Sequence, residues 1–196
     1  MAGVFDYARL LFRTIFTPAK GCTLHIAEIG WDITIPQGFH LLTAKRMQQM
    51  DTRYRKKLSG KTDISLQKHM VKGEFWAEFE IENKFGCSIT DLDETPEREW
   101  RNKCNDTCNA MLNYFHAAYK EYASVNISTE QETRQKGDIL FEVFEISATT
   151  PSRLLHRTRY YSAIYKNHGI FITMSFADDK IGEQMLNALR NSTFAA

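Results

Sequence analysis

Two alternating strands in the C-terminal third constrain the fold of this chain more than any other feature. Apolar and polar side chains alternate over residues 170–176, which is the period of a half-buried strand. Residues 161–165 repeat this period, and the intervening Lys166 to Gly169 tolerate the positive φ that a tight hairpin turn requires. The apolar side of this predicted hairpin consists of Tyr161, Ala163, Tyr165, Ile170, Ile172, Met174 and Phe176.

A helix is expected directly after the hairpin. Asp178 or Asp179 can cap its N-terminus, because a carboxylate accepts hydrogen bonds from the first free backbone N–H groups. Its apolar face consists of Ile181, Met185, Ala188 and Leu189. A hairpin that leads into an amphipathic helix predicts an antiparallel sheet with a helix over one side.

The rest of the chain extends this pattern. Further helices are expected at 43–58 and 95–122, and the polar residues 124–137 are expected to form a loop. Further strands are expected at 31–35, 74–82, 85–90 and 139–146. The order of elements predicts an α+β fold, an antiparallel β-sheet flanked by helices, in a single domain over residues 21–196.

A separate amphipathic helix is predicted at residues 4–16, within an N-terminal segment 1–20. Such a short helix is marginal alone, so it packs on the domain or contacts a membrane surface or a second chain. Asp6, Arg9 and Arg13 interrupt the apolar run that a signal peptide needs. A cytoplasmic location is therefore the simplest expectation, with a periplasmic or envelope location if an export signal has been removed.

The composition is that of an ordinary soluble protein. The 196 residues carry a net charge of +1, with 43% hydrophobic and 25% charged side chains. This balance gives no reason to expect nucleic acid as a partner. The four cysteines are too few and too scattered for a disulfide scaffold, and no apolar run approaches the roughly 20 residues that span a bilayer.

Charge is unevenly distributed in the first half of the chain. Residues 43–72 hold nine basic side chains against two acidic ones, and residues 74–99 hold nine acidic side chains against two basic ones. Two such segments can screen each other on the surface, or they can form a bipolar surface that steers a charged protein partner. On the second interpretation the contact residues are Arg53, Arg55, Lys56 and Lys57.

A second candidate contact lies near the predicted C-terminal hairpin, where cations and aromatic residues mix. Arg157 with Tyr160 is a candidate anchor for a protein partner. The simpler interpretation is strand alternation, with arginines pointing outward and tyrosines half-buried.

Candidates for chemistry are sparse. Cys104 and Cys108 are four residues apart on the predicted helix 95–122, a spacing at which two thiolates can bind one metal ion. The simpler interpretation is two small residues in a core stripe. Asp91, Asp93 and Glu94 resemble the start of a calcium loop, but its glycine and its distal acid are missing, so a turn that caps the next helix explains them better.

No nucleophile elbow, phosphate-binding loop or dinucleotide fingerprint occurs in the sequence. We therefore expect no enzymatic activity, no metal and no cofactor. A metal- or small-molecule-dependent activity near Cys104 and Cys108 is kept as an alternative.

Three segments carry a resemblance to a known family. An early strand stops at Pro36-Gln37-Gly38, a hairpin occupies 161–176, and a closing helix ends just before Thr193-Phe194. In this order the chain resembles the PsbP-like superfamily, whose fold is shared by the photosystem II extrinsic protein PsbP, the yeast Ran-binding import factor and DcrB-like bacterial proteins. The resemblance covers residues 30–194 as a pattern of elements.

The resemblance implies an α/β/α sandwich with an antiparallel sheet, to which the helix at 4–16 is an addition. It also implies a protein-binding role, since members act as assembly factors, G-protein binders, envelope proteins and effector chaperones. The superfamily has no shared active site that could be carried over to residues of this chain.

We therefore expect a non-enzymatic accessory factor of the chaperone, assembly or immunity kind, which holds another protein through a charged surface and a sheet face. A membrane- or envelope-associated protein docked through residues 4–16 is the main alternative. The sequence leaves the identity of the partner and the oligomeric state open.

Overall fold

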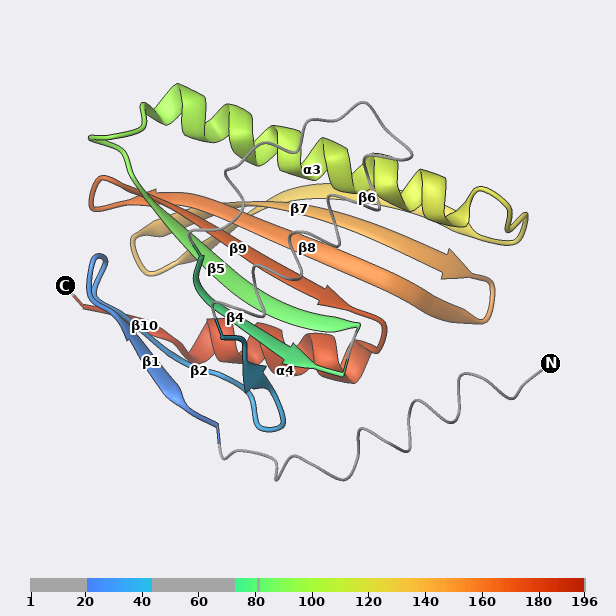
Figure 1. Cartoon of the computed structure of the whole chain (residues 1–196), viewed down its shortest axis with the longest axis horizontal. Coiled ribbons are helices and arrows are strands. Elements are labelled where there is room, and N and C mark those ends of the chain that lie inside the picture. The colour runs from blue at the N-terminus through green and yellow to red at the C-terminus, as the bar shows by residue number, and fades with distance from the viewer. Residues whose placement is uncertain (1–20, 44–72, 81, 196) are drawn as a thin grey trace.

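The computed structural model describes residues 21–43, 73–80 and 82–195. Within them it contains two sheets and two helices, arranged as layers (Figure 1). The helices predicted at 4–16 and 43–58 lie outside the described residues. None of the described helices is both long and apolar enough to cross a membrane.

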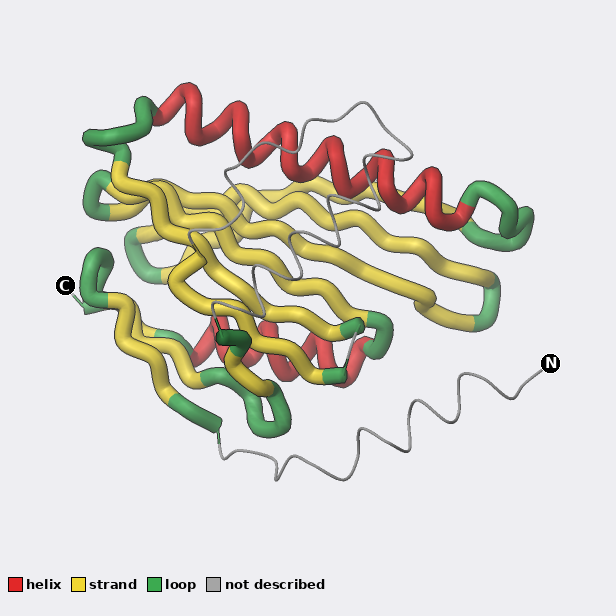
Figure 2. The backbone as a smooth tube through the Cα atoms, viewed as in Figure 1, coloured by secondary structure: helices red, strands yellow, loops and turns green. Residues whose placement is uncertain are grey.

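Seven antiparallel strands form the main sheet, in the order β3-β4-β5-β9-β8-β7-β6. The strands are β3 (His40–Leu41), β4 (Gly73–Phe79), β5 (Asn83–Asp91), β6 (Asn126–Lys136), β7 (Ile139–Thr150), β8 (Arg153–Tyr165) and β9 (His168–Phe176). Helix α3 (Glu97–Tyr119) lies over one face of this sheet, and helix α4 (Asp179–Asn191) lies over the other (Figure 2). We call these the α3 face and the α4 face.

The predicted C-terminal hairpin is formed by β8 and β9. Lys166 and Asn167 have φ of 47° and 60°, so both central turn residues are left-handed, as the tightest hairpin turns require. The residues predicted to point inward are buried, with Ile170, Ile172 and Met174 at 0% exposure, except Tyr165, which is half-buried. They form the main core on the α4 face.

Helix α4 and a small sheet close this core. Asp178 caps α4 as predicted, its Oδ1 accepting the backbone N–H groups of Lys180 at 2.7 Å and Ile181 at 3.3 Å. The small sheet contains β1 (Thr23–Ile26), β2 (Trp31–Thr34) and β10 (Thr193–Phe194), with β2 in the centre. The ring of Trp31 in β2 stacks on that of Phe194 in β10 with centroids 5.3 Å apart, which ties the last residues to the N-terminal part of the fold.

On the other side of the sheet, α3 covers a second and smaller core. Trp100 in its first turn is 3% exposed and lies directly over Gly169 of β9. Phe115, near its end, belongs to a buried cluster with Ile146 of β7 and Tyr160 of β8. Aromatic side chains thus fix both ends of α3 on the sheet.

The structure corrects two predictions about elements. Residues 124–137 were expected to form a loop, but β6 pairs with β7 over its whole length, from Asn126 opposite Thr149 to Lys136 opposite Ile139. A polar edge strand has no apolar period, so the sequence carries no strand signal there. The N-terminal strand also has a partner, β1, which the sequence analysis missed. The predicted α+β class, an antiparallel sheet with helices on both faces, is confirmed.

Candidate protein-binding surfaces

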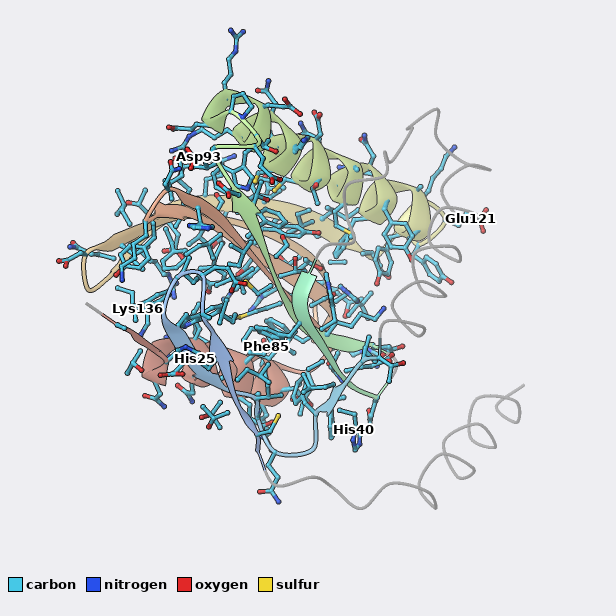
Figure 3. The ribbon with its side chains drawn as sticks, turned by 60° about the vertical axis from the view of Figure 1, so that its left-hand side comes forward. His25, His40, Phe85, Asp93, Glu121 and Lys136 are labelled. Carbon is cyan, nitrogen blue, oxygen red and sulfur yellow. The ribbon has the colours of Figure 1, made fainter. Side chains whose placement is uncertain are left out.

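A hollow lies at the corner where α3 ends and β6 begins. The chain folds back there through two turns, with the N–H of Tyr122 donating to the carbonyl oxygen of Tyr119 and the N–H of Val125 donating to that of Tyr122, both at 3.0 Å. The hollow has a volume of about 620 Å³. Its lining includes His116, Tyr119, Lys120, Tyr122, Val125 and Ile127. Figure 3 shows this corner next to the labelled Glu121.

The two tyrosines give this hollow its chemical character. Tyr122 is 61% exposed, and its ring centroid lies 6.4 Å from that of Tyr119. Tyr119 in turn contacts the buried Phe115, with centroids 6.0 Å apart. Burial raises the pKa of Tyr119, so its hydroxyl stays protonated and can donate a hydrogen bond. Such a site can hold an apolar side chain and satisfy a neighbouring acceptor, as interface tyrosines commonly do.

The acidic segment 74–99 does not form one surface. Glu80 and Glu82 lie at the turn between β4 and β5, whereas Asp91 and Asp93 lie at the opposite end of β5. The nine residues of β5 span about 30 Å, so the two groups are well separated. Asp91 accepts the N–H of Asp93 at 2.9 Å, which forms the predicted turn into α3. In the described part of the chain no three His, Cys, Asp or Glu side chains are grouped as a metal site.

The basic half of the proposed bipolar surface, with Arg53, Arg55, Lys56 and Lys57, lies outside the described residues. The same holds for the predicted helix at 4–16. Electrostatic steering by these residues and membrane contact through that helix therefore stay predictions.

The structure does not bring Arg157 and Tyr160 together. Successive residues of a strand point to opposite faces, so two residues three positions apart lie on different sides of the sheet. Tyr160 is 3% exposed on the α3 face, where its ring stacks on Phe171 at 5.3 Å. Arg157 is on the α4 face and forms ion pairs with Glu145 at 3.0 Å and Asp179 at 3.2 Å.

Arg157 is part of a half-buried ionic cluster. Glu145 of β7 also pairs with Arg159, the next residue of β8 on that face. Both guanidinium groups lie 6.0 Å from the ring centroid of Phe176. The carboxylate and the ring together hold the two arginines in place, and Asp179 links the cluster to the first turn of α4.

Cys104 and Cys108 face the sheet from the inner side of α3. Burial raises the pKa of each thiol to about 12, so both are protonated at neutral pH. A metal ion would have to displace both protons, because the thiolate is the ligand. The placement of the two side chains matches the interpretation as small residues in a core stripe.

One polar cluster was missed by the sequence analysis. His156 Nε2 of β8 lies 2.7 Å from Ser175 Oγ of β9, and Thr158 Oγ1 lies 3.1 Å from the same oxygen. The edge of the His156 ring meets Phe115, with centroids 5.2 Å apart. Burial lowers the pKa of His156 to about 4, with Lys84 adding to the effect, so the imidazole is neutral at physiological pH. Among the described residues no carboxylate pairs with this ring.

The pairing register of β8 and β9 is the information that would have predicted this cluster. Thr158 lies opposite Ser175 in that register. Once the turn residues of a hairpin are identified, the register of its two strands follows. His156 then follows as the neighbouring residue on the same face.

These layers define an α+β sandwich of the PsbP type, with one antiparallel sheet between two helical faces. The solution structure of PsbP (CyanoP) from the cyanobacterium Synechocystis sp. PCC 6803 matches this chain with a TM-score of 0.51. The match covers 93% of this chain and 96% of that chain at 8% sequence identity. The chain therefore has the PsbP-like fold, as its pattern of elements predicted. No model of a protein family matches the sequence, and no curated protein does.

Proposed function

We propose that this chain is a non-enzymatic accessory factor, of the chaperone, assembly or immunity kind, that binds another protein at the hollow between α3 and β6. The observation that carries the proposal is the exposure of Tyr122. The ring is 61% exposed beside a hollow of about 620 Å³, whereas Trp100 and Phe115 of α3 are only 3% and 1% exposed. Exposed tyrosines beside a hollow are typical anchors of protein interfaces.

The state of the reactive side chains supports binding rather than chemistry. The thiols of Cys104 and Cys108 are protonated, and the neutral His156 is hydrogen-bonded to Ser175. The resemblance described above implies the same role, because it is to a superfamily used mainly for binding proteins.

Affinity capture from the source cells tests the proposal, with the bound proteins identified by mass spectrometry. We expect the wild-type chain to retain a specific partner. We expect Tyr122→Asp to weaken its binding by about tenfold or more, since loss of an interface anchor costs over 1 kcal/mol. Leu140→Asp is the matched control, because Leu140 is also exposed, at 59%, but lies in β7 away from the hollow. Equal binding by both variants would refute the hollow as the site.

The same capture tests the charged surface. If residues 43–72 steer the partner, charge reversal at Arg55, Lys56 and Lys57 should slow association most at low salt and little at high salt. Capture that does not respond to these reversals removes the steering claim and leaves the hollow as the proposed contact.

A further inference from the structure

The edge of the main sheet at β6 is long, regular and open. β6 has 11 residues and pairs with β7 without a register shift. In the described part of the chain no strand pairs with its outer side, because β6 ends the strand order. The opposite edge is the two-residue β3, whose shortness protects it from pairing. β6 contains no proline, glycine or bulge that would block the addition of another strand.

The charges of β6 lie on one face and follow a simple order. Glu132 is opposite Val143 of the core and Arg134 is opposite Phe141, so both point to the α4 face. Alternation puts Glu130 and Lys136 on the same face. Along this face the strand therefore carries two negative charges followed by two positive charges.

We propose that two copies of the chain pair through β6, antiparallel, with Thr133 of each copy on the two-fold axis. In this register Glu132 is directly opposite the partner's Arg134, and Glu130 is opposite the partner's Lys136. The symmetry repeats each pair, so four pairs of opposite charge form along seven residues. The two main sheets become one continuous sheet, and the pairing leaves the hollow of each copy outside the joined strands.

The charges select this register over its neighbours. Residues directly opposite each other in an antiparallel pair point to the same face of the sheet. A two-fold axis perpendicular to the sheet therefore has to pass through a residue, and the alternative registers place it at another residue of β6. An axis at Glu132 sets Glu132 opposite itself, and an axis at Arg134 sets Arg134 opposite itself. An axis at Gln131 sets Glu130 opposite the partner's Glu132. Like charges directly opposite each other destabilise a strand pair, so only the axis at Thr133 pairs all four charges favourably.

Glu132 and Arg134 already lie close to each other on this face, whereas Lys136 must leave an internal contact to reach the second copy. Arg134 Nη2 lies 2.6 Å from Glu132 Oε1 of the same copy, and Lys136 Nζ donates to the carbonyl oxygen of Arg190 at 2.8 Å. In the paired edges, Glu132 and Arg134 of one copy and the same two residues of the second copy form a ring of four alternating charges. Joined edges alone bury less surface than a standard interface, so the dimer is expected to be reversible, micromolar in affinity and weakened by salt.

Charge reversal distinguishes this register from every other mode of association. Sedimentation velocity over the micromolar range should show a monomer–dimer equilibrium for the wild-type chain. Glu132→Lys and Arg134→Glu should each weaken the dimer by about tenfold or more, because each sets two pairs of like charge opposite one another. An equimolar mixture of the two variants should restore the dimer, because Lys at 132 then meets Glu at 134. Gln131→Lys, on the other face, should leave it unchanged.

Disulfide trapping tests the same register without charge changes. In a Cys22→Ser background, Thr133→Cys should crosslink two copies on mild oxidation, because its two Cβ atoms meet at the axis about 5 Å apart. Thr129→Cys is the matched control, an exposed threonine on the same face whose two copies lie about 27 Å apart. A monomer at all concentrations, a dimer indifferent to the reversals, or equal crosslinking at 129 and 133 would overturn the proposal.

Discussion

At Gly169 the backbone of β9 lies directly beneath the indole ring of Trp100. A Cβ atom at this position would be 2.4 Å from the ring, well inside any normal contact. We expect Gly169→Ala to lower the free energy of unfolding by about 1–3 kcal/mol, because Trp100 must leave its site over the sheet. Urea unfolding measures this. Gly137→Asn is the control, since Gly137 has φ of 58° with open space around it and asparagine tolerates that conformation. Equal losses in the two variants would contradict the account.

His156 gives the stability of the molecule a predictable dependence on pH. Burial lowers the pKa of the folded imidazole to about 4, whereas the unfolded chain has the ordinary value of 6.5. Between these values the unfolded state binds a proton that the folded state excludes. The free energy of unfolding should therefore be fully retained above pH 6.5 and should fall, by up to about 3 kcal/mol, as the pH drops from 6.5 to 4.

Carboxylates titrate in the same range, so the measurement is a comparison with His156→Gln, which removes the titrating ring. We expect the variant to be less stable at neutral pH and to lose less stability on acidification. Two parallel pH profiles would show that His156 does not carry the effect.

At the scale of single elements, the N-terminus of α4 depends on one side chain. Asp178 Oδ1 accepts two backbone N–H groups that would otherwise lack partners. We expect Asp178→Ala to lower the free energy of unfolding by about 1 kcal/mol and Asp178→Asn to have a much smaller effect, because asparagine keeps an acceptor oxygen. Thermal unfolding of the two variants measures the difference. A loss as large for asparagine as for alanine would mean that the cap is not the cause.

The elements that could be predicted from sequence are those with one buried and one exposed face. β8, β9 and α4 were placed with most of the correct residues inward, because each has an apolar side against the main core, although the buried Leu186 of α4 was missed. β6 could not be predicted, because it lies at the edge and its charged and amide side chains follow no apolar period. Its pairing with β7 is set by the two-residue turn Gly137-Asp138, in which Gly137 has φ of 58°.

The candidate site shows the same limit. The long helix was expected to continue to residue 122, but α3 ends at Tyr119 and the ring of Tyr122 is 61% exposed. The sequence has no glycine or proline at that point to indicate the end of the helix. The contact of His156 with Ser175 depends on strand register rather than on spacing along the chain, so no sequence motif predicts it.

At the scale of the whole molecule, this chain shares its fold with cyanobacterial PsbP. Only 8% of aligned residues are identical, yet the match covers 93% of this chain. The two proteins thus share an arrangement of layers and few of the residues that build it. The two proposed contacts therefore rest on the surface of this chain itself, another protein at the hollow beside Tyr122 and a second copy at the open edge of β6.

Hydrogen exchange of the captured complex tests the central claim most directly. The chain is measured alone and with its captured partner, and protection of the backbone amides is compared segment by segment. The account predicts added protection over residues 116–127, which surround the hollow, and none from the partner over α4. Protection centred on α4 and the small sheet, with residues 116–127 unchanged, would contradict it.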